Sequence, residues 1–257
     1  MWTLTEVIHM KKYTKYLSEI AASAAAGHVA MPVRNYLSCG RRTRFLVSGK
    51  VSRSIRCLSC KSTAISLANV AQIQQLPLDP ATSAVYELAY HGAVHRYLKQ
   101  RFACFECSEH VGPPAGGVRV NGVRNEDVQK LSFEDSCLAP VSCTEAFVHV
   151  PDCLADFSKL YRVLRPGGWF VFTVPFFDAE CTQAIRALTS HGALQWVDAE
   201  EYHDRQVTGV GTVPVFGHHS KRQILEGLQK VGFREAHLVK SRDFVSRIPQ
   251  FFGVAQK

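Results

Sequence analysis

The sequence YRVLRPGGWFVFTVPF, residues 161–176, carries the clearest structural signal in this chain. Apolar residues at helical spacing lead into it from Leu154, and Pro166, Gly167 and Gly168 then interrupt the helical pattern. The run 169–174 that follows is almost wholly apolar and has the length of a strand, as expected for a strand that is covered on both faces. The stretch predicts a helix, a tight turn and a buried sheet strand.

The chain from residue 63 onward alternates between helix and strand patterns. We expect helices over 63–75, 94–101, 154–164 and 221–231, and strands over 84–90, 102–107, 123–124, 140–143, 169–174, 237–240 and 251–255. A further helix is expected over 3–26, ahead of a short-stranded, turn-rich segment. Alternation of this kind predicts an α/β fold, with a doubly wound, mainly parallel sheet and helices on both of its faces.

The composition is typical of a soluble globular protein, with 46% hydrophobic residues, 20% charged residues and a mean hydropathy of −0.05 over 257 residues. No apolar stretch approaches the roughly 20 residues that span a bilayer, and Lys11, Lys12, Lys15 and Glu19 interrupt any signal-peptide core. The nine cysteines are odd in number, and most stand singly in apolar runs, which is typical of a reducing compartment. We therefore expect a cytoplasmic protein.

The positive charge is concentrated at the N-terminus. Residues 1–62 hold 11 Lys and Arg against 2 Asp and Glu, whereas residues 63–257 hold 19 against 20. A basic segment favours nucleic acid or another anionic partner, although a solvated basic face without a partner gives the same pattern. The charge change also suggests two parts, a basic N-terminal segment over 1–62 and a larger domain over 63–257.

Several motifs between residues 84 and 257 match one family. Along the chain these motifs are GVRNEDVQKLSF (122–133), TEAFVHVPD (144–152) and RVLRPGG (162–168). In these motifs the chain resembles the class I S-adenosylmethionine-dependent methyltransferases, and among them a bacterial branch with a small N-terminal zinc ribbon. The resemblance implies a Rossmann-like, seven-stranded sheet that binds S-adenosylmethionine at its carboxyl edge and transfers the methyl group to an acceptor. The acceptor cannot be identified from the sequence.

The resemblance also implies a set of cofactor-binding residues. The matched positions are Glu87, Ala89, Gly92, Glu109, Asp127 and Cys143. Glu87 begins the counterpart of the family's ExGxGxG loop, which holds the methionine end of the cofactor. Glu109, or its neighbour Glu106, falls at the acid for the ribose hydroxyls, and Asp127 falls at the acid on the adenine side. A solvated surface carboxylate is the alternative for each acid.

The chain departs from the family pattern in the same region. Ala89 and His91 stand where glycines would allow close approach of the backbone, and Leu138 replaces an acid. Pro140 falls in a predicted central strand, an unusual place for proline, and Val148 stands where the family has Glu. These departures support a second hypothesis, in which a catalytically inactive methyltransferase-like protein acts as a binding or scaffolding module.

Two histidines are candidates for a general base. Methyl transfer to oxygen or nitrogen can require a base with a pKa near the working pH, and His is the natural choice. His149 and His203 occupy the matched positions closest to where the family's acceptor would lie. A structural or exposed histidine is the commoner interpretation of any one of them.

The N-terminal segment retains part of a zinc ribbon. Cys57 and Cys60 have the spacing of one knuckle, but Tyr36 stands where the other knuckle needs a thiolate, which leaves Cys39 as the third ligand. His28 is the only fourth ligand within reach. The sequence predicts either a structural zinc site or a metal-free minidomain of reduced cysteines.

Overall fold

The computed structural model describes most of the chain from residue 33 onward. The described residues are 33–36, 41–47, 55–60, 62–112, 116–144, 146–173, 176–177, 184–185, 187–190, 193–204, 212–242 and 249–257, together with Ala21, Ala24 and Ala25. These three alanines are helical. The rest of the predicted helix 3–26 lies outside the described residues.

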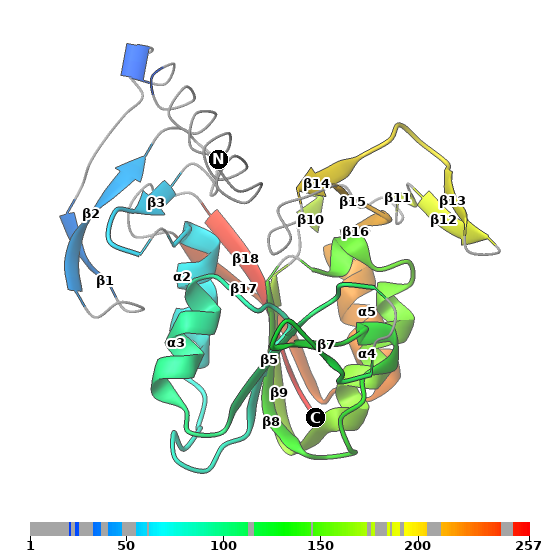
Figure 1. Cartoon of the computed structure of the whole chain (residues 1–257), viewed down its shortest axis with the longest axis horizontal. Helices are drawn as coiled ribbons and strands as arrows, with labels where there is room; N and C mark the ends of the chain where they lie inside the picture. Colours follow the sequence, from blue (N-terminus) through cyan, green and yellow to red (C-terminus); the bar gives the residue numbers. More distant parts are fainter. Residues whose placement is uncertain are drawn as a thin grey trace.

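One eight-stranded sheet organises the larger part of the protein (Figure 1). Its strands are β4 (Val85–Glu87), β5 (Phe105–Glu109), β6 (Arg119–Val120), β7 (Val123–Asn125), β8 (Leu138–Thr144), β9 (Leu164–Thr173), β17 (Glu235–Arg242) and β18 (Pro249–Gln256), in the order β17-β18-β9-β8-β4-β5-β7-β6. The four pairings that join β9, β8, β4, β5 and β7 are parallel, and the other three are antiparallel. The predicted doubly wound, mainly parallel sheet is confirmed. The seven expected strands are all present, and the two-residue edge strand β6 is an addition.

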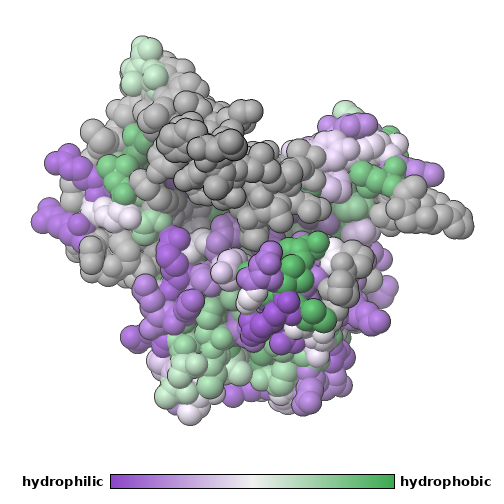
Figure 2. All heavy atoms as spheres, in the orientation of Figure 1, coloured by the Kyte–Doolittle hydropathy of each residue, from purple (hydrophilic) through white to green (hydrophobic). Residues whose placement is uncertain are grey.

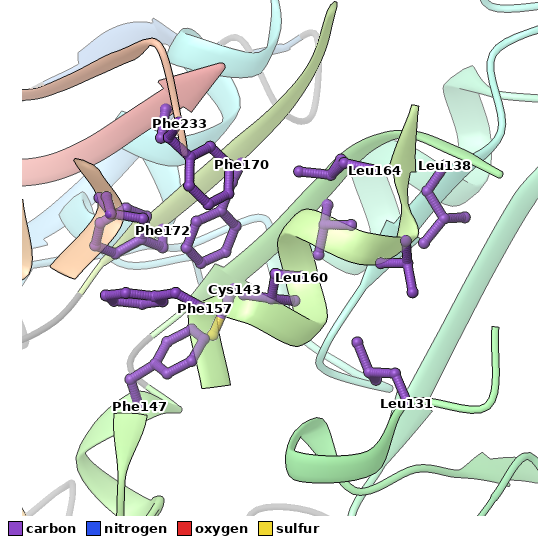
Figure 3. Close-up of a cluster of buried hydrophobic side chains, with 14 of the residues drawn as sticks. Leu131, Leu138, Cys143, Phe147, Phe157, Leu160, Leu164, Phe170, Phe172 and Phe233 are labelled. Atoms are coloured by element: carbon purple, nitrogen blue, oxygen red, sulfur yellow. The ribbon is translucent and has the colours of Figure 1, made fainter. Parts of the chain in front are cut away.

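Helices cover both faces of the sheet. The helices α2 (Ala64–Ile73) and α3 (Ala93–Arg101) lie on one face, and α4 (Cys153–Val163) and α5 (Lys221–Val231) lie on the other (Figure 1). Side chains alternate across β9, so Phe170 and Phe172 pack with α4 and α5, while Val171 packs with α2 and α3. Figure 3 shows the phenylalanine side of this core. The predicted strand buried on both faces is therefore confirmed.

Pro140 is accommodated by an irregularity in the pairing of β8 with β9, where β9 holds the extra residues. The pairing of β8 with β9 shifts register between Leu138 and Pro140, so that Pro140 lies opposite Trp169. A bulge is one of the few places in a sheet where the missing N–H of proline is tolerated. This residue therefore does not argue against a central strand.

A small antiparallel sheet precedes the main one. It consists of β1 (Val33–Tyr36), β2 (Arg41–Val47) and β3 (Ile55–Cys57), in that order, and we call it the ribbon. Phe45, Ile55 and Cys57 of the ribbon pack on Ala64 and Leu67 of α2. Because other side chains of α2 contact the main sheet, this helix connects the two parts.

Several short elements complete the described part of the chain, and Figure 1 shows those from β10 to β16 beyond one end of the sheet. They are η2 (Val128–Lys130), η3 (Phe147–His149), β10 (Phe176–Phe177), β11 (Ala184–Ile185), β12 (Ala187–Ser190), β13 (Ala193–Trp196), β14 (Tyr202–Asp204), β15 (Thr212–Pro214) and β16 (Gly217–Ser220). None of the helices in the described ranges is long and apolar enough to cross a membrane.

Replacement of Gly168 by alanine tests the turn before the apolar part of β9. A Cβ on Gly168 would lie 2.8 Å from the carbonyl oxygens of Ala139 and Arg165, which are backbone atoms. We expect Gly168→Ala to reduce the free energy of unfolding by about 1–3 kcal/mol in thermal denaturation. Gly167→Asn is the control. A Cβ added to Gly167 would have its nearest neighbouring atom 4.0 Å away, and Asn tolerates the positive φ of 75° at this position. Equal losses in the two variants would contradict the packing argument.

Candidate functional site

The parallel strands bring several polar residues to one edge of the sheet. In β4, β5 and β7 the last residues are Glu87, Glu109 and Asn125, and β8 ends at Thr144. Glu87 lies opposite Ser142 of β8, and Glu109 lies opposite Asn125. Open α/β sheets bind their ligands at the carboxyl ends of such strands. This edge is therefore the candidate site.

Glu87 is buried at the centre of the edge. Its side chain is 1% exposed and accepts a hydrogen bond from the hydroxyl of Ser142. Burial raises the pKa of Glu87 to about 7, because a desolvated carboxylate is disfavoured, and the Ser142 hydrogen bond opposes this shift only in part. The carboxyl group can therefore change its charge near neutral pH.

The turn after β4 remains open in spite of its altered sequence. Gly92 has φ 102° and ψ −172°, a conformation that favours glycine, and it precedes the first residue of α3. A Cβ built on Gly92 would meet no atom within 4 Å. Ala89 is half-buried and the side chain of His91 is exposed. Apart from the adjoining residues His91 and Ala93, no atom therefore fills the space beside Gly92.

The two acidic residues that follow β7, Glu126 and Asp127, differ in their surroundings. Glu126 is buried and accepts a 2.7 Å hydrogen bond from Nε of Arg124, whose guanidinium lies 4.2 Å from the centre of the Phe133 ring. Asp127 is half-buried, and its Oδ1 accepts a 2.9 Å hydrogen bond from the backbone N–H of Gln129 at the start of η2. Asp127 is thus held at the edge by the backbone that follows it.

The structure also separates the two candidates for the ribose acid. Glu106, early in β5, forms a 3.0 Å ion pair with Arg119. Glu109 ends the same strand at the carboxyl edge, and its backbone carbonyl accepts a hydrogen bond from the N–H of Glu126. This placement supports Glu109 over Glu106. Cys143, one residue from the end of β8, is fully buried.

Sequence reasoning missed two buried polar residues. Among the described residues, Asn69 Oδ1 and Asp156 Oδ2 are buried without a hydrogen-bond partner. The amide nitrogen of Asn69, in α2, donates a 2.9 Å hydrogen bond to Oγ1 of Thr144 at the end of β8. A buried oxygen without a donor is costly, so such atoms often mark where a ligand binds. The signal in the sequence was one Asn in an otherwise apolar helix segment.

Asp156 lies in the first turn of α4, which packs against η2. Burial, together with the negative charges of Asp152 and Asp127, raises its pKa to about 7, while Lys159 opposes the shift. Asp127 and Asp156 therefore influence each other electrostatically. The edge holds two carboxyl groups, Glu87 and Asp156, that titrate near neutral pH.

The two predicted histidines belong to neighbouring segments. Nδ1 of His149, at the end of η3, lies 2.9 Å from the carbonyl oxygen of Pro214 in β15. A carbonyl oxygen only accepts, so Nδ1 carries the proton and Nε2 is the basic atom of the neutral ring. His203 lies in β14 opposite Val213, next to Pro214 in β15. The backbone thus brings the two positions to the same end of the site.

The described part of the ribbon contains one Cys-x-x-Cys knuckle, formed by Cys57 and Cys60. The backbone N–H of Cys60 donates to Sγ of Cys57 at 3.4 Å, and Sγ of Cys60 lies 2.9 Å from the hydroxyl of Ser62. Within the residues that the structure describes, no group of three or more His, Cys, Asp or Glu could hold a metal ion. Cys39 and His28 lie outside those residues, so the zinc site stays a prediction.

Comparison with known proteins finds a likeness over the middle of the chain. Residues 91–172, from the turn after β4 into β9, match the family model described as a methyltransferase domain. No curated protein sequence matches the chain.

Two solved structures illustrate what the chain is similar to. One is an S-adenosylmethionine-dependent methyltransferase from Mesorhizobium loti, with 17% identity over 74% of this chain and 98% of that one and a TM-score of 0.47. The other is 1,6-didemethyltoxoflavin-N1-methyltransferase from Burkholderia thailandensis with bound 1,6-didemethyltoxoflavin and S-adenosylhomocysteine, with 13% identity over 76% and 78% of the chains and a TM-score of 0.46. Over residues 91–172, this chain is thus similar to a methyltransferase domain.

Proposed function

We propose that this protein transfers a methyl group from S-adenosylmethionine to an acceptor, which the basic N-terminal segment suggests is anionic. One observation carries the proposal: the open positive-φ turn at Gly92 lies at the same sheet edge as Glu87, Glu109 and Asp127. An open turn next to acids suits a cationic ligand that also presents hydroxyl and amino donors.

The residues at the edge are suited to hold the parts of this cofactor. When bound, S-adenosylmethionine supplies a methyl group on a positively charged sulfur, which a nucleophile can displace. Glu87 and the turn over Ala89 and Gly92 would hold its methionine end, and Cys143 lies in the strand beside them. Glu109 would accept from the ribose hydroxyls and Asp127 from the adenine amino group.

The two orphaned oxygens support this fit. The Oδ1 atom of Asn69 is buried beside the end of β8 and can accept a hydrogen bond from an amine, and Oδ2 of Asp156 is a second buried acceptor. Binding a donor would remove the cost of leaving these atoms unpaired. The fit thus involves α2 and α4 as well as the strand ends.

His149 is the first candidate for the general base. Its Nδ1 is held by the carbonyl of Pro214, which orients the ring and leaves Nε2 to take a proton from an oxygen or nitrogen nucleophile. His203 is the alternative, since β14 pairs with the strand that holds Pro214. The main contribution of the site would be to hold the acceptor in line with the methyl group.

The inactive-module hypothesis has less support. It rested on the departures at Ala89, His91, Leu138, Pro140 and Val148. Of these, the side chain of His91 is exposed, and Pro140 lies at a register shift that accommodates it. Location in the cytoplasm stays a proposal that rests on the number and spacing of the cysteines. The division into a segment over 1–62 and a domain over 63–257 is also a proposal, which the contrast in charge supports.

Calorimetric titration with S-adenosylmethionine and S-adenosylhomocysteine tests the proposed function. We expect a dissociation constant in the micromolar range, about −8 kcal/mol. Asp127→Ala should weaken binding about 10- to 100-fold, because it removes a charged hydrogen-bond acceptor. Glu226→Gln, on the exposed face of α5, should leave the affinity unchanged. Absence of heat and of any thermal shift at millimolar ligand would overturn the proposal and favour the inactive module.

The buried carboxyl of Glu87 predicts a specific pH dependence of stability. Its pKa is about 7 in the folded chain against 4.5 as the ordinary value, so the stabilisation from its retained proton is complete below pH 4.5 and is lost as the pH rises to about 7. Between these two pH values, the free energy of unfolding should decrease by an amount on the order of 3 kcal/mol in the unchanged protein. Glu87→Gln keeps an acceptor for Ser142 and should remove this decrease. Denaturant unfolding at several pH values measures it. Glu226→Gln should retain the full pH dependence, and an unchanged dependence in Glu87→Gln would show that Glu87 is ionised throughout.

A further inference from the structure

The first part of β2 exposes two arginine side chains on one face of the ribbon. Along β2, Arg42 and Arg44 are exposed while Thr43 and Phe45 are buried, because successive side chains in a strand point to opposite faces. Phe45 packs toward α2, so Arg42 and Arg44 lie on the side of the ribbon away from that helix. Figure 2 shows strongly hydrophilic atoms beside hydrophobic ones at the ribbon, in the upper left.

An exposed apolar residue, Leu58, follows β3 and lies beside Arg44. Arg42, Thr43, Arg44 and Leu58 line a hollow of about 510 Å³. The backbone N–H of Leu58 donates a 3.0 Å hydrogen bond to the carbonyl oxygen of Arg44, which places Leu58 beside that residue. The Leu58 side chain is 40% exposed. We call Arg42, Arg44 and Leu58 the arginine face.

No acidic residue of this segment offsets the positive charge. Residues 33–62 contain no Asp or Glu. Their basic residues are Arg34, Arg41, Arg42, Arg44, Lys50, Arg53, Arg56 and Lys61. The basic surface continues onto α3, where the exposed Arg96 donates a hydrogen bond to the backbone carbonyl of Cys60 and Lys99 is also exposed. The helix α3 has no acidic residue either.

We propose that the arginine face binds single-stranded nucleic acid. Guanidinium groups bind phosphate oxygens in a bidentate manner, and two of them on neighbouring exposed positions of one strand can contact one phosphodiester backbone. The exposed Leu58 beside Arg44 offers an apolar contact that an unpaired base or sugar can use, whereas a duplex keeps its bases stacked inside. This binding goes beyond the proposed methyl transfer, because it requires neither the cofactor nor the edge of the main sheet.

Fluorescence anisotropy with a labelled single-stranded RNA of about 20 nucleotides tests the proposal in the full-length protein without cofactor. Affinity should fall steeply as salt rises from about 50 to 200 mM. The double variant Arg42→Gln/Arg44→Gln should raise the dissociation constant at least about 10-fold and reduce the slope of log affinity against log salt by about 1.4. The matched control Lys230→Gln/Arg234→Gln removes the same charge from exposed positions in and after α5, and should change affinity less than about 2-fold.

Competitors define the ligand. Single-stranded DNA that competes as well as RNA would mean that the strand backbone is recognised, and a preference for RNA would mean that the 2′-hydroxyl contributes; both results support the proposal. Equal weakening in the two double variants, stronger competition by a duplex of the same sequence, or absence of RNA binding at low salt would overturn it. Loss of binding to phosphatidylserine vesicles in the arginine-face variant, with no RNA binding, would assign the face to membranes instead. Because no cofactor is present, none of these results bears on methyl transfer.

Discussion

The burial of β9 on both faces is the constraint on which the rest of the structure depends. Phe170 and Phe172 stack at 4.5 Å between ring centres under α4 and α5, and Val171 contacts the helices of the opposite layer. A strand that is apolar on both sides is stable only between two helical layers, because neither face can be left to water. Parallel connections to its neighbours then require helices to cross over the sheet.

This arrangement also creates the site. Parallel strands end at one edge, so residues separated by tens of positions in sequence, such as Glu87 and Asp127, come to the same border of the sheet. The same burial that stabilises the core raises the pKa values of Glu87 and Asp156, because their carboxyl groups lie where water cannot solvate a charge. Burying these carboxyl groups lowers the stability of the folded chain, as is common at functional sites.

The connection through α2 gives the protein its second organising feature. The helix packs against the ribbon with Ala64 and Leu67 and against the main sheet with Val70 and Ile73. In addition, Asn69 reaches the end of β8. A helix that is buried on two sides shows little of the amphipathic pattern that would reveal either contact, and for this reason sequence reasoning did not assign Asn69 to the site.

Local patterns alone determined the order and type of the main elements. The helix over 221–231 was predicted with the bounds that are observed, since Gly232 marks its end, and in the structure Ser220 caps its start. The alternation of helix and strand was enough to predict the parallel sheet. The roles of the acids Glu87 and Asp127 were predicted only from the resemblance to a family. Only the tertiary structure decided that the turn at Gly92 is open, that Pro140 lies at a register shift, and that Glu106 is held in an ion pair while Glu109 ends its strand. The reason is physical: helix ends and apolar periods depend on neighbours in sequence, whereas the space beside a glycine or the partner of a buried charge depends on segments that meet only after folding.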